Sequence, residues 1–491
     1  MFLLYIILFF FGFYYVLRII IIYWRLSQDG FKVIEFGLHY LSAPDSHERI
    51  SRRSCQTGEP AYVILRGYKP SIVVSDPNLV RSISTTYFSS FHGRWTGPFE
   101  KNENIESEVS VFAASGGRWK RLRTIISLTM SSKKLNSLSG IIQNSTDQFI
   151  QYISKMENIS EVNIHKLFQV HTADVLTRCV FGKKYSDHND HAYLDLSSKL
   201  FGNTFGFFTY EHFAIAFPMF SSIFLYLQES LQYEKKKIAA TFRDMLITFK
   251  KNCTSQNISF LSTMKSFEVD ETKRNQSEEI SGNIQFLSLR IKRQITSGEL
   301  MAQCRFLSVA GFDTTANTLA YVCFQLARHP KVQEELFDEL LSNPENSELL
   351  QHTIFESLRL YPHASPLQQR KCMSDCKIGK LFFRAGYHIV IDPWTIHRDV
   401  NVWGADAHCF NPKRFQTLTE DQRISFMPFG VGPRQCAGMR FALIELKITL
   451  TDLLLNYHLS LPNKDSLITC TLRESMTIWP INMNISLTKR G

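Results

Sequence analysis

The sequence lacks the cysteine spacings that would indicate a disulfide framework or a zinc site. Its ten cysteines are scattered over 491 residues, and no two of them are separated by only two residues. This absence argues against a small secreted scaffold. It fits a domain that folds in the reducing surroundings of the cytosol.

Two further kinds of segment are missing. No linker of the usual composition divides the chain, although its length alone would allow about three domains. No basic run is interleaved with aromatic residues, so we expect no nucleic-acid partner. The net charge of +10 is consistent either with a basic surface near anionic lipid or with a docking face for an acidic redox partner.

A long hydrophobic run stands at the N-terminus. Residues 1–24 are apolar except for Arg18, and about 20 apolar residues suffice for a helix to span a bilayer. No basic segment precedes the run and no small-residue cleavage site follows it, which argues against a cleaved signal peptide. Because Arg25 and Lys32 follow the run, we expect its C-terminal side to face the cytosol.

Residues 1–24 are predicted to form an uncleaved membrane anchor. The family resemblance carried by the motifs below implies a divergent linker over 25–59 and one large domain over 60–491. No proline occurs before Pro44, so the linker lacks a proline-rich hinge. Within the domain, residues 61–65 and 71–75 flank Gly67 and Pro70, which predicts a β-hairpin.

A turn-rich stretch near the C-terminus carries one cysteine. Residues 426–438 contain Pro428, Gly430, Gly432 and Pro433 before Cys436, and a helix-forming segment follows from Met439. Backbone N–H groups at a helix start lower the pKa of a thiol, and the thiolate is a ligand for soft metals, haem iron among them. A buried structural cysteine is an equally good interpretation of these residues alone.

The pattern from Phe429 through Gly432, Arg434 and Cys436 to Gly438 resembles the haem-binding signature of the cytochrome P450 family. This resemblance implies a mainly α fold with small β-sheets, the cytochrome P450 fold, behind a single N-terminal transmembrane helix. It also implies haem b as the cofactor, with Cys436 as the axial ligand of its iron and Phe429 beside it.

A second motif lies in a long predicted helix. A capping-box pattern at 296–299 and a stop at His329-Pro330 predict a helix up to Arg328. Its centre, residues 310–315, holds Gly, Asp and two Thr where strong helix formers are expected. Thr314 could simply bond to its own helix. The stretch resembles the oxygen-activation motif of the family, which implies that Thr314 hydrogen-bonds an oxygen species or a water and that Asp313 supplies protons.

Other segments match the family in the same order. Trp119 and Arg123 share one helix face, and the resemblance implies that they contact a haem propionate. It assigns the same role to Arg370 and Arg434. Lys120 and Arg121 should point elsewhere, as part of a redox-partner face.

An acid–base pair is predicted to form a scaffold. Glu356 and Arg359 are three residues apart on a predicted helix. The resemblance implies that they are buried together with Arg414. The stretch of residues 330–356 is shorter than is usual in the family.

We therefore predict a haem-thiolate monooxygenase that inserts one atom of O₂ into an apolar small molecule. The aromatic-rich residues 201–227 and the loop 88–111 favour such a substrate without identifying it. Without a flavin or dinucleotide motif of its own, the chain should receive electrons from NADPH–cytochrome P450 reductase, with cytochrome b5 as a further donor. The expected location is the endoplasmic reticulum membrane, with the domain in the cytosol. Two alternatives remain open: an isomerase or dehydratase that needs no external electrons, and an inactive haem-binding or haemless relative.

Overall fold

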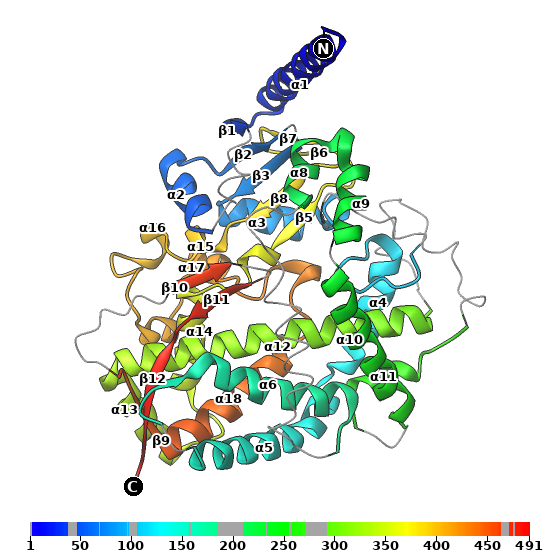
Figure 1. Ribbon diagram of the computed structural model, residues 1–491. Coiled ribbons are helices and arrows are strands. Elements are labelled where there is room, and N and C mark those ends of the chain that lie inside the picture. The colour runs from blue at the N-terminus through cyan, green and yellow to red at the C-terminus, as the bar shows by residue number, and fades with distance from the viewer. Residues whose placement is uncertain are drawn as a thin grey trace.

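The protein is mainly helical, with four small sheets among the residues described (Figure 1). The computed structural model describes residues 2–37, 47–67, 69–95, 97, 106–156, 159–184, 210–231, 233–254, 258–270, 292–462, 471–474 and 477–491. The predicted fold class is confirmed. Residues 201–209 of the aromatic-rich segment lie outside the described part of the chain, so the prediction made for them stays a prediction.

The α-helices are α1 (Phe2–Gln28), α2 (His47–Thr57), α3 (Pro77–Ser84), α4 (Gly116–Thr129), α5 (Ser132–Ser154), α6 (Ile164–Phe181), α8 (Tyr210–Ala216), α9 (Ser221–Leu231), α10 (Tyr233–Asn252), α11 (Phe260–Lys265), α12 (Ser297–Arg328), α13 (Pro330–Ser342), α14 (Glu348–Leu360), α15 (Pro393–Ile396), α16 (Val400–Trp403), α17 (Glu420–Ser425) and α18 (Met439–Asn456). Short 3-10 turns are η2 (Phe88–Ser90), η3 (Pro218–Phe220), η7 (Ser365–Leu367), η8 (Pro412–Gln416) and η9 (Gly432–Arg434). The strands are β1 (Lys32–Gly37), β2 (Ala61–Arg66), β3 (Lys69–Val74), β4 (Val162–Asn163), β5 (Gln369–Lys371), β6 (Cys376–Ile378), β7 (Leu381–Phe383), β8 (His388–Ile391), β9 (Tyr457–Ser460), β10 (Thr471–Glu474), β11 (Ile478–Ile481) and β12 (Asn484–Lys489).

The largest sheet contains the predicted hairpin. Its order is β1-β2-β3-β8-β5, and β2 pairs with β3 in antiparallel fashion. Gly67 between these two strands has a φ of +59°, and a Cβ atom there would lie 2.7 Å from the carbonyl oxygen of Ala216 in α8. Only glycine satisfies both constraints.

Part of the stretch expected to be a linker belongs to the domain. β1 pairs with β2 in parallel, which adds residues 32–37 to the largest sheet. In α2, the Ser54 hydroxyl donates a hydrogen bond to the Asp392 carboxylate at 2.8 Å. The strand β1 joins the sheet although no proline-rich hinge precedes it. The sequence pattern alone did not reveal its pairing with β2.

Helix α12 crosses the domain and connects two hydrophobic clusters. Its first half contributes Leu300, Cys304 and Phe312 to one cluster, and its second half contributes Leu319 and Leu326 to the other. Figure 1 shows α6 and α18 running alongside it. The helix therefore packs against both hydrophobic clusters, one on each side of its centre.

The predicted ends of α12 are confirmed. Thr296 and Glu299 form the capping box, in which the Glu299 backbone N–H donates to Thr296 Oγ1 at 3.3 Å and the Thr296 N–H to Glu299 Oε2 at 3.1 Å. The helix stays continuous through residues 310–315. Gly311 there has a packing role that the sequence did not indicate, because a Cβ atom would lie 2.7 Å from Leu176 Cδ2 in α6.

The short segment between Pro330 and Glu356 folds into two helices, α13 and α14, and α14 has a side-chain cap. The Ser347 hydroxyl accepts a hydrogen bond from the Leu350 N–H at 3.0 Å, and a Glu339 carboxylate oxygen accepts one from the Leu349 N–H at 3.1 Å. These bonds satisfy orphan donors at the start of α14. The shorter connection therefore still places Glu356 on a helix.

The N-terminal helix is longer than predicted and is joined firmly to the domain. α1 continues to Gln28, and residues 9–28 are long and apolar enough to cross a membrane. Leu26 is fully buried in the cluster around the largest sheet. Directly after the helix, the Asp29 carboxylate accepts two hydrogen bonds from Arg384, at 2.7 and 2.5 Å, and one from the Tyr387 hydroxyl at 2.8 Å.

We expect Asp29→Asn to lower the free energy of unfolding by about 1–3 kcal/mol, because a buried carboxylate with three donors is replaced by a neutral amide. Denaturant unfolding of the detergent-solubilised full chain measures this difference. The control is Glu59→Gln, whose partner Lys32 lies 3.5 Å away in a pair that is half exposed. That variant should cost less than about 1 kcal/mol. Equal losses for the two variants would contradict the role given to Asp29.

Candidate active site

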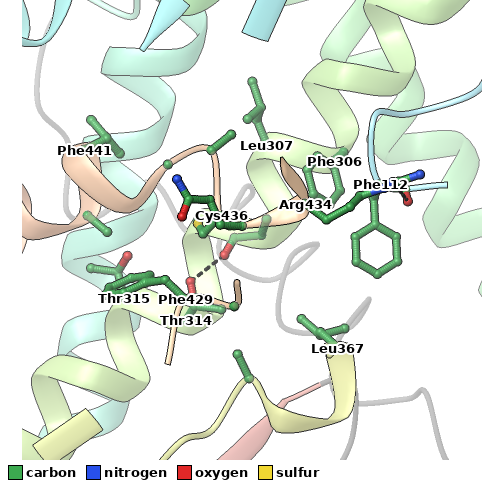
Figure 2. A pocket seen from close by; sticks show the side chains of 18 of the residues that line it. Phe112, Phe306, Leu307, Thr314, Thr315, Leu367, Phe429, Arg434, Cys436 and Phe441 are labelled. Carbon is green, nitrogen blue, oxygen red and sulfur yellow. Dashed lines mark hydrogen bonds between the residues drawn. The ribbon is translucent and has the colours of Figure 1, made fainter. Parts of the chain in front are cut away.

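A cavity of about 240 Å³ lies in the centre of the domain. This volume is far above the roughly 10–15 Å³ that one water molecule needs, so the cavity has room for a ligand. Its wall comes from α4, α6, α12 and α18, from the chain around η7 and β5, and from the loop that holds Cys436. Figure 2 shows Thr314, Phe429 and Cys436 close together at this cavity.

The loop before Cys436 depends on two glycines in the left-handed region. Gly430 and Gly432 have φ angles of +75° and +74°. A Cβ atom on Gly432 would run into the carbonyl oxygen of Ser84. The Cys436 N–H donates to the Phe429 carbonyl at 2.8 Å, which closes the loop just before α18 begins. The predicted layout, a cysteine at a helix start, is confirmed.

The environment of the Cys436 thiol differs from the expectation in one respect. The side chain is exposed although it lies deep in the domain, because it faces the cavity. Burial raises the pKa of the thiol, and the backbone N–H groups of Gly438 and Met439 together with Arg123 and Arg94 offset this only in part. The helix start lowers the pKa of the thiol, but desolvation is the larger effect.

Several arginine side chains line the cavity, and no acidic side chain among the described lining residues neutralises their charge. Trp119, Arg123, Arg370 and Arg434, which the resemblance assigns to the propionates, all line the cavity, and Arg94 joins them. No Asp or Glu is found among the lining residues in the described part of the chain. Sequence reasoning missed Arg94, because it lies in a loop without any helical or strand pattern that would orient it.

These arginines have unused hydrogen-bonding capacity. The Nε atoms of Arg94 and Arg370 are buried without a partner. Burial, then repulsion by Arg370, holds the pKa of Arg94 well below its usual range, and burial lowers the pKa of Arg370 to about 10 and also lowers that of Arg123. An anionic ligand with two carboxylates would relieve both the repulsion and the missing partners.

Arg434 has a second role that the sequence did not indicate. Its guanidinium group donates to the carbonyl oxygens of His92, Val111, Phe112 and Ala114 and stacks over the Trp119 ring, whose centroid lies 4.9 Å from its Cζ. Arg434 therefore ties the cysteine loop to the segment before α4. Its predicted contact with a propionate stays a prediction.

The neighbours of Trp119 are placed differently from the expectation. Arg121 is buried, and its guanidinium donates to both carboxylate oxygens of Glu299, at 3.0 and 2.7 Å. Arg118 donates to the same carboxylate at 2.8 Å. The prediction that Arg121 belongs to an exposed docking face is therefore wrong, because the face of α4 opposite the cavity packs on the start of α12. Lys120 is half-buried.

The two residues of the α12 motif face different ways. Thr314 lines the cavity, and its hydroxyl donates to the Ala310 carbonyl of its own helix at 2.6 Å. Asp313 does not line the cavity and is fully buried. Its carboxylate accepts hydrogen bonds from Asn317 at 3.1 Å and from the Thr477 hydroxyl. Adjacent residues in a helix differ by about 100° in direction, which separates the two side chains.

The predicted acid–base scaffold is present, and its members Glu356 and Arg359 are fully buried. Arg359 donates to both carboxylate oxygens of Glu356, at 2.7 and 2.8 Å, and Arg414 lies 3.4 Å from the same carboxylate. The remaining Arg359 donors bind the carbonyls of His397, Ala407 and Cys409.

The scaffold is tied to the cysteine loop by hydrogen bonds to Met427. His397 Nε2 accepts a hydrogen bond from the Met427 N–H at 3.0 Å. The Gln368 side-chain amide donates to the Met427 carbonyl at 2.8 Å. The scaffold thus sets the position of the loop that presents Cys436.

Comparison with known proteins finds one matching family model and relatives that carry the same family name. The family model described as Cytochrome P450 matches residues 33–485. Caenorhabditis elegans CYP13A8, named as a cytochrome P450, is 31% identical over 460 residues, which cover 87% of this chain and 88% of the relative. CYP13A1 of the same organism is 31% identical over 425 residues, or 80% of each chain. CYP13A2 is 30% identical over 435 residues, covering 81% of this chain and 80% of the relative.

We expect Glu356→Gln to destabilise the domain by about 3–5 kcal/mol, because it leaves the buried charge of Arg359 uncompensated. Chemical unfolding followed by circular dichroism measures the loss. Glu335→Gln is the matched control: its partner Lys413, next to Arg414 in the chain, lies 2.9 Å away in an exposed pair. The control should cost less than about 1 kcal/mol. A Glu356 variant as stable as the control would show that the buried pair has no structural role.

Proposed function

Because this chain belongs to the cytochrome P450 family, whose members are haem-thiolate monooxygenases, we propose that Cys436 is the thiolate ligand of its haem iron. The observation that supports this assignment is the position of the sulfur. Among the described residues that line the central cavity, Cys436 is the one cysteine. Several other cysteines, such as Cys179 and Cys323, are buried in the core away from it.

The residues around the cavity fit haem. Arg94, Arg123 and Arg370 would bind its two propionates, since their charges have no acid in the cavity wall. Phe429, together with the aliphatic residues of α12 and α18, would flank the macrocycle. When bound, haem supplies the activation of dioxygen with two external electrons, so that one oxygen atom enters the substrate and the other leaves as water.

Thr314 would bind a water molecule on the α12 side of the cavity. Its hydroxyl hydrogen is used by the Ala310 carbonyl, so the oxygen retains lone pairs that can accept a hydrogen bond from a donor in the cavity. Asp313 would serve as the proton reservoir behind the helix. Burial raises its pKa to about 6, which brings the carboxyl group close to the pH at which it can both release and regain a proton.

NADPH–cytochrome P450 reductase, with cytochrome b5 as a further donor, would supply the electrons. Lys133, Lys134 and Arg440 are exposed near the start of α18, where Arg440 lies 3.4 Å from the Ser132 hydroxyl. Arg440 follows Cys436 closely in the sequence, and its contact with Ser132 brings Lys133 and Lys134 to the same place. This basic patch suits a partner with an acidic surface.

The chain would be held in the endoplasmic reticulum membrane with its domain in the cytosol. The N-terminal α1 contacts the η3 region through the ring pairs Phe11–Phe220 and Tyr15–Phe217, each with centroids 5.6 Å apart. Met219, Ile223 and Tyr226, beside these rings, are all more than half exposed. Apolar side chains of this kind beside a membrane-spanning helix favour contact with lipid.

The substrate would be an apolar small molecule. Phe112, Phe306, Leu307 and Leu367 form an apolar part of the cavity wall (Figure 2). Burial of apolar surface is the largest contribution that such a wall can make to binding.

We expect the reduced, CO-bound holoprotein to show the red-shifted absorption band of a thiolate-ligated haem, and Cys436→Ser to lose it. The matched control is Cys55→Ser, which changes an exposed cysteine and should keep the band. A wild-type protein that binds haem without this band would refute the assignment of Cys436. Product formation without added reductase would instead favour an isomerase or dehydratase.

We expect Arg94→Ala to weaken haem retention by about ten- to a hundredfold, because one charge-assisted hydrogen bond contributes about 1.5–3 kcal/mol. The rate of haem transfer to an excess of an apo-globin measures this. Arg305→Ala, at an exposed arginine paired with Glu108, should retain haem like the wild type. Equal transfer rates for the Arg94 variant and the wild type would show that Arg94 does not bind the cofactor.

A further inference from the structure

A buried polar cluster lies beside the cavity. It is formed by Asp313 and Asn317 of α12, Thr477 before β11, His165 of α6 and His363 after α14, and each of these side chains is at most 5% exposed. Three bonds hold part of it together: Asn317 and Thr477 both donate to Asp313, and Asn317 also donates to the Thr477 hydroxyl at 3.3 Å. Most of the surrounding core is apolar, so these side chains require a specific explanation.

The backbone brings the cluster together. The Ile478 N–H donates to the His363 carbonyl at 2.9 Å, and the Ile478 carbonyl accepts from the Tyr321 hydroxyl at 3.0 Å. The segment next to Thr477 is therefore bound both to α12 and to His363. On the other side, His165 interacts with Asn317 and lies near enough to His363 to lower its pKa.

Two buried atoms of this cluster, Asp313 Oδ1 and His363 Nδ1, have no hydrogen-bond partner within the described chain. Asn317 Oδ1 and His165 Nε2 have no partner in ordinary hydrogen-bond geometry, although the two side chains interact with each other. A buried polar atom without a partner costs about 1–3 kcal/mol, and buried water commonly satisfies such atoms. Asn317 bonds to Asp313 and interacts with His165, and His165 in turn lies near His363. A water molecule among these side chains would have the two to four polar partners that it needs.

His363 connects the cluster to the cavity. It lines the cavity wall, as Thr318 does. Its Nε2 lies 2.9 Å from the Thr318 hydroxyl, which itself donates to the Thr314 carbonyl at 2.9 Å. Because a hydroxyl has one hydrogen to donate, Thr318 accepts from His363 at Nε2. The imidazole then carries its proton on Nε2 and presents Nδ1 to the cluster as an acceptor.

We propose that water held among Asp313, Asn317, His165 and His363 forms a proton path from Asp313 to the cavity, in which His363 is the relaying side chain. The proposal rests on the function proposed above. One proton leaves the Asp313 carboxyl group for the water, and a water proton passes to His363 Nδ1. The Nε2 proton passes to Thr318, whose hydroxyl proton enters the cavity. One proton enters the path and one leaves it.

This path gives Asp313, the proposed proton reservoir, a route to the cavity. Asp313 points away from the cavity, so it cannot deliver a proton there directly. Burial lowers the pKa of His363 to about 3, so its imidazole is neutral and passes protons by exchanging its two tautomers rather than by holding a charge. The hydroxyl of Thr314 is not required for this transfer.

The first test is structural and does not depend on activity. A crystal structure of the haem-loaded protein, at a resolution that shows ordered water, should contain a water molecule within hydrogen-bond distance of both His363 Nδ1 and Asp313 Oδ1, or two linked ones. A cluster without water between these atoms would overturn the proposal. This readout remains valid even if the wild-type protein shows no turnover, an outcome that would refute the proposed function alone.

The second test measures proton-dependent oxygen consumption. The holoenzyme with reductase and NADPH reduces O₂ with two electrons and two protons to H₂O₂ when no substrate is added. We expect His363→Phe, Thr318→Val and Asp313→Asn each to slow NADPH oxidation on the order of tenfold and to raise the solvent deuterium isotope effect. The double variant of His363 and Asp313 should be no slower than either single variant, since both would interrupt one path.

The chain offers a matched control. Like His363, His171 of α6 is a buried histidine, and its Nε2 lies 2.9 Å from a threonine hydroxyl, that of Thr449. Unlike His363, it does not line the cavity. His171→Phe removes the same kind of bond and should leave the oxidation rate and the isotope effect unchanged. All variants are compared at equal haem content. A His363→Phe protein that oxidises NADPH at the wild-type rate, or effects of the two single variants that multiply in the double variant, would overturn the proposal.

Discussion

Buried positive charge around Cys436 is the constraint on which the rest of the structure depends. Elsewhere in the described chain, two buried arginines have acidic partners: Arg121 binds Glu299, and Arg359 binds Glu356. Around the cavity, Arg94 and Arg370 have none, and their lowered pKa values reflect the cost of that arrangement. Such a site is stable only if an anion is bound or the scaffold is strong enough to hold the charges apart.

Hydrogen bonds between distant segments hold the charged side chains around the cavity in place. Arg434 connects the cysteine loop to four carbonyls before α4, and Met427 is held from two sides by His397 and Gln368. The centre of α12 also has two roles. One face of its centre lines the cavity with Thr314, and the neighbouring face carries Asp313 into a polar cluster.

Local patterns predicted the elements better than the directions of their side chains. The capping box, the hairpin and the Glu356–Arg359 pair depend on residues close together in the sequence, and all three are present. Arg121 was misplaced because its partner, Glu299, lies 178 positions away. Arg94 was missed because it lies in a loop without a regular pattern. β1 was taken for linker because its role comes from pairing with β2, a separate segment.

By itself, the sequence determined the cysteine at a helix start and the helical frame. These follow from spacing, turn residues and hydrophobic period, which are properties of a short stretch of chain. The family came from the resemblance of several such stretches to the motifs of cytochrome P450. Only the tertiary structure decided that Arg434 binds backbone carbonyls and that Asp313 faces away from the cavity. It also decided that His363 lines the cavity beside Thr318. Burial and partner choice decide such roles, and they arise when segments more than a hundred residues apart pack against each other and exclude water.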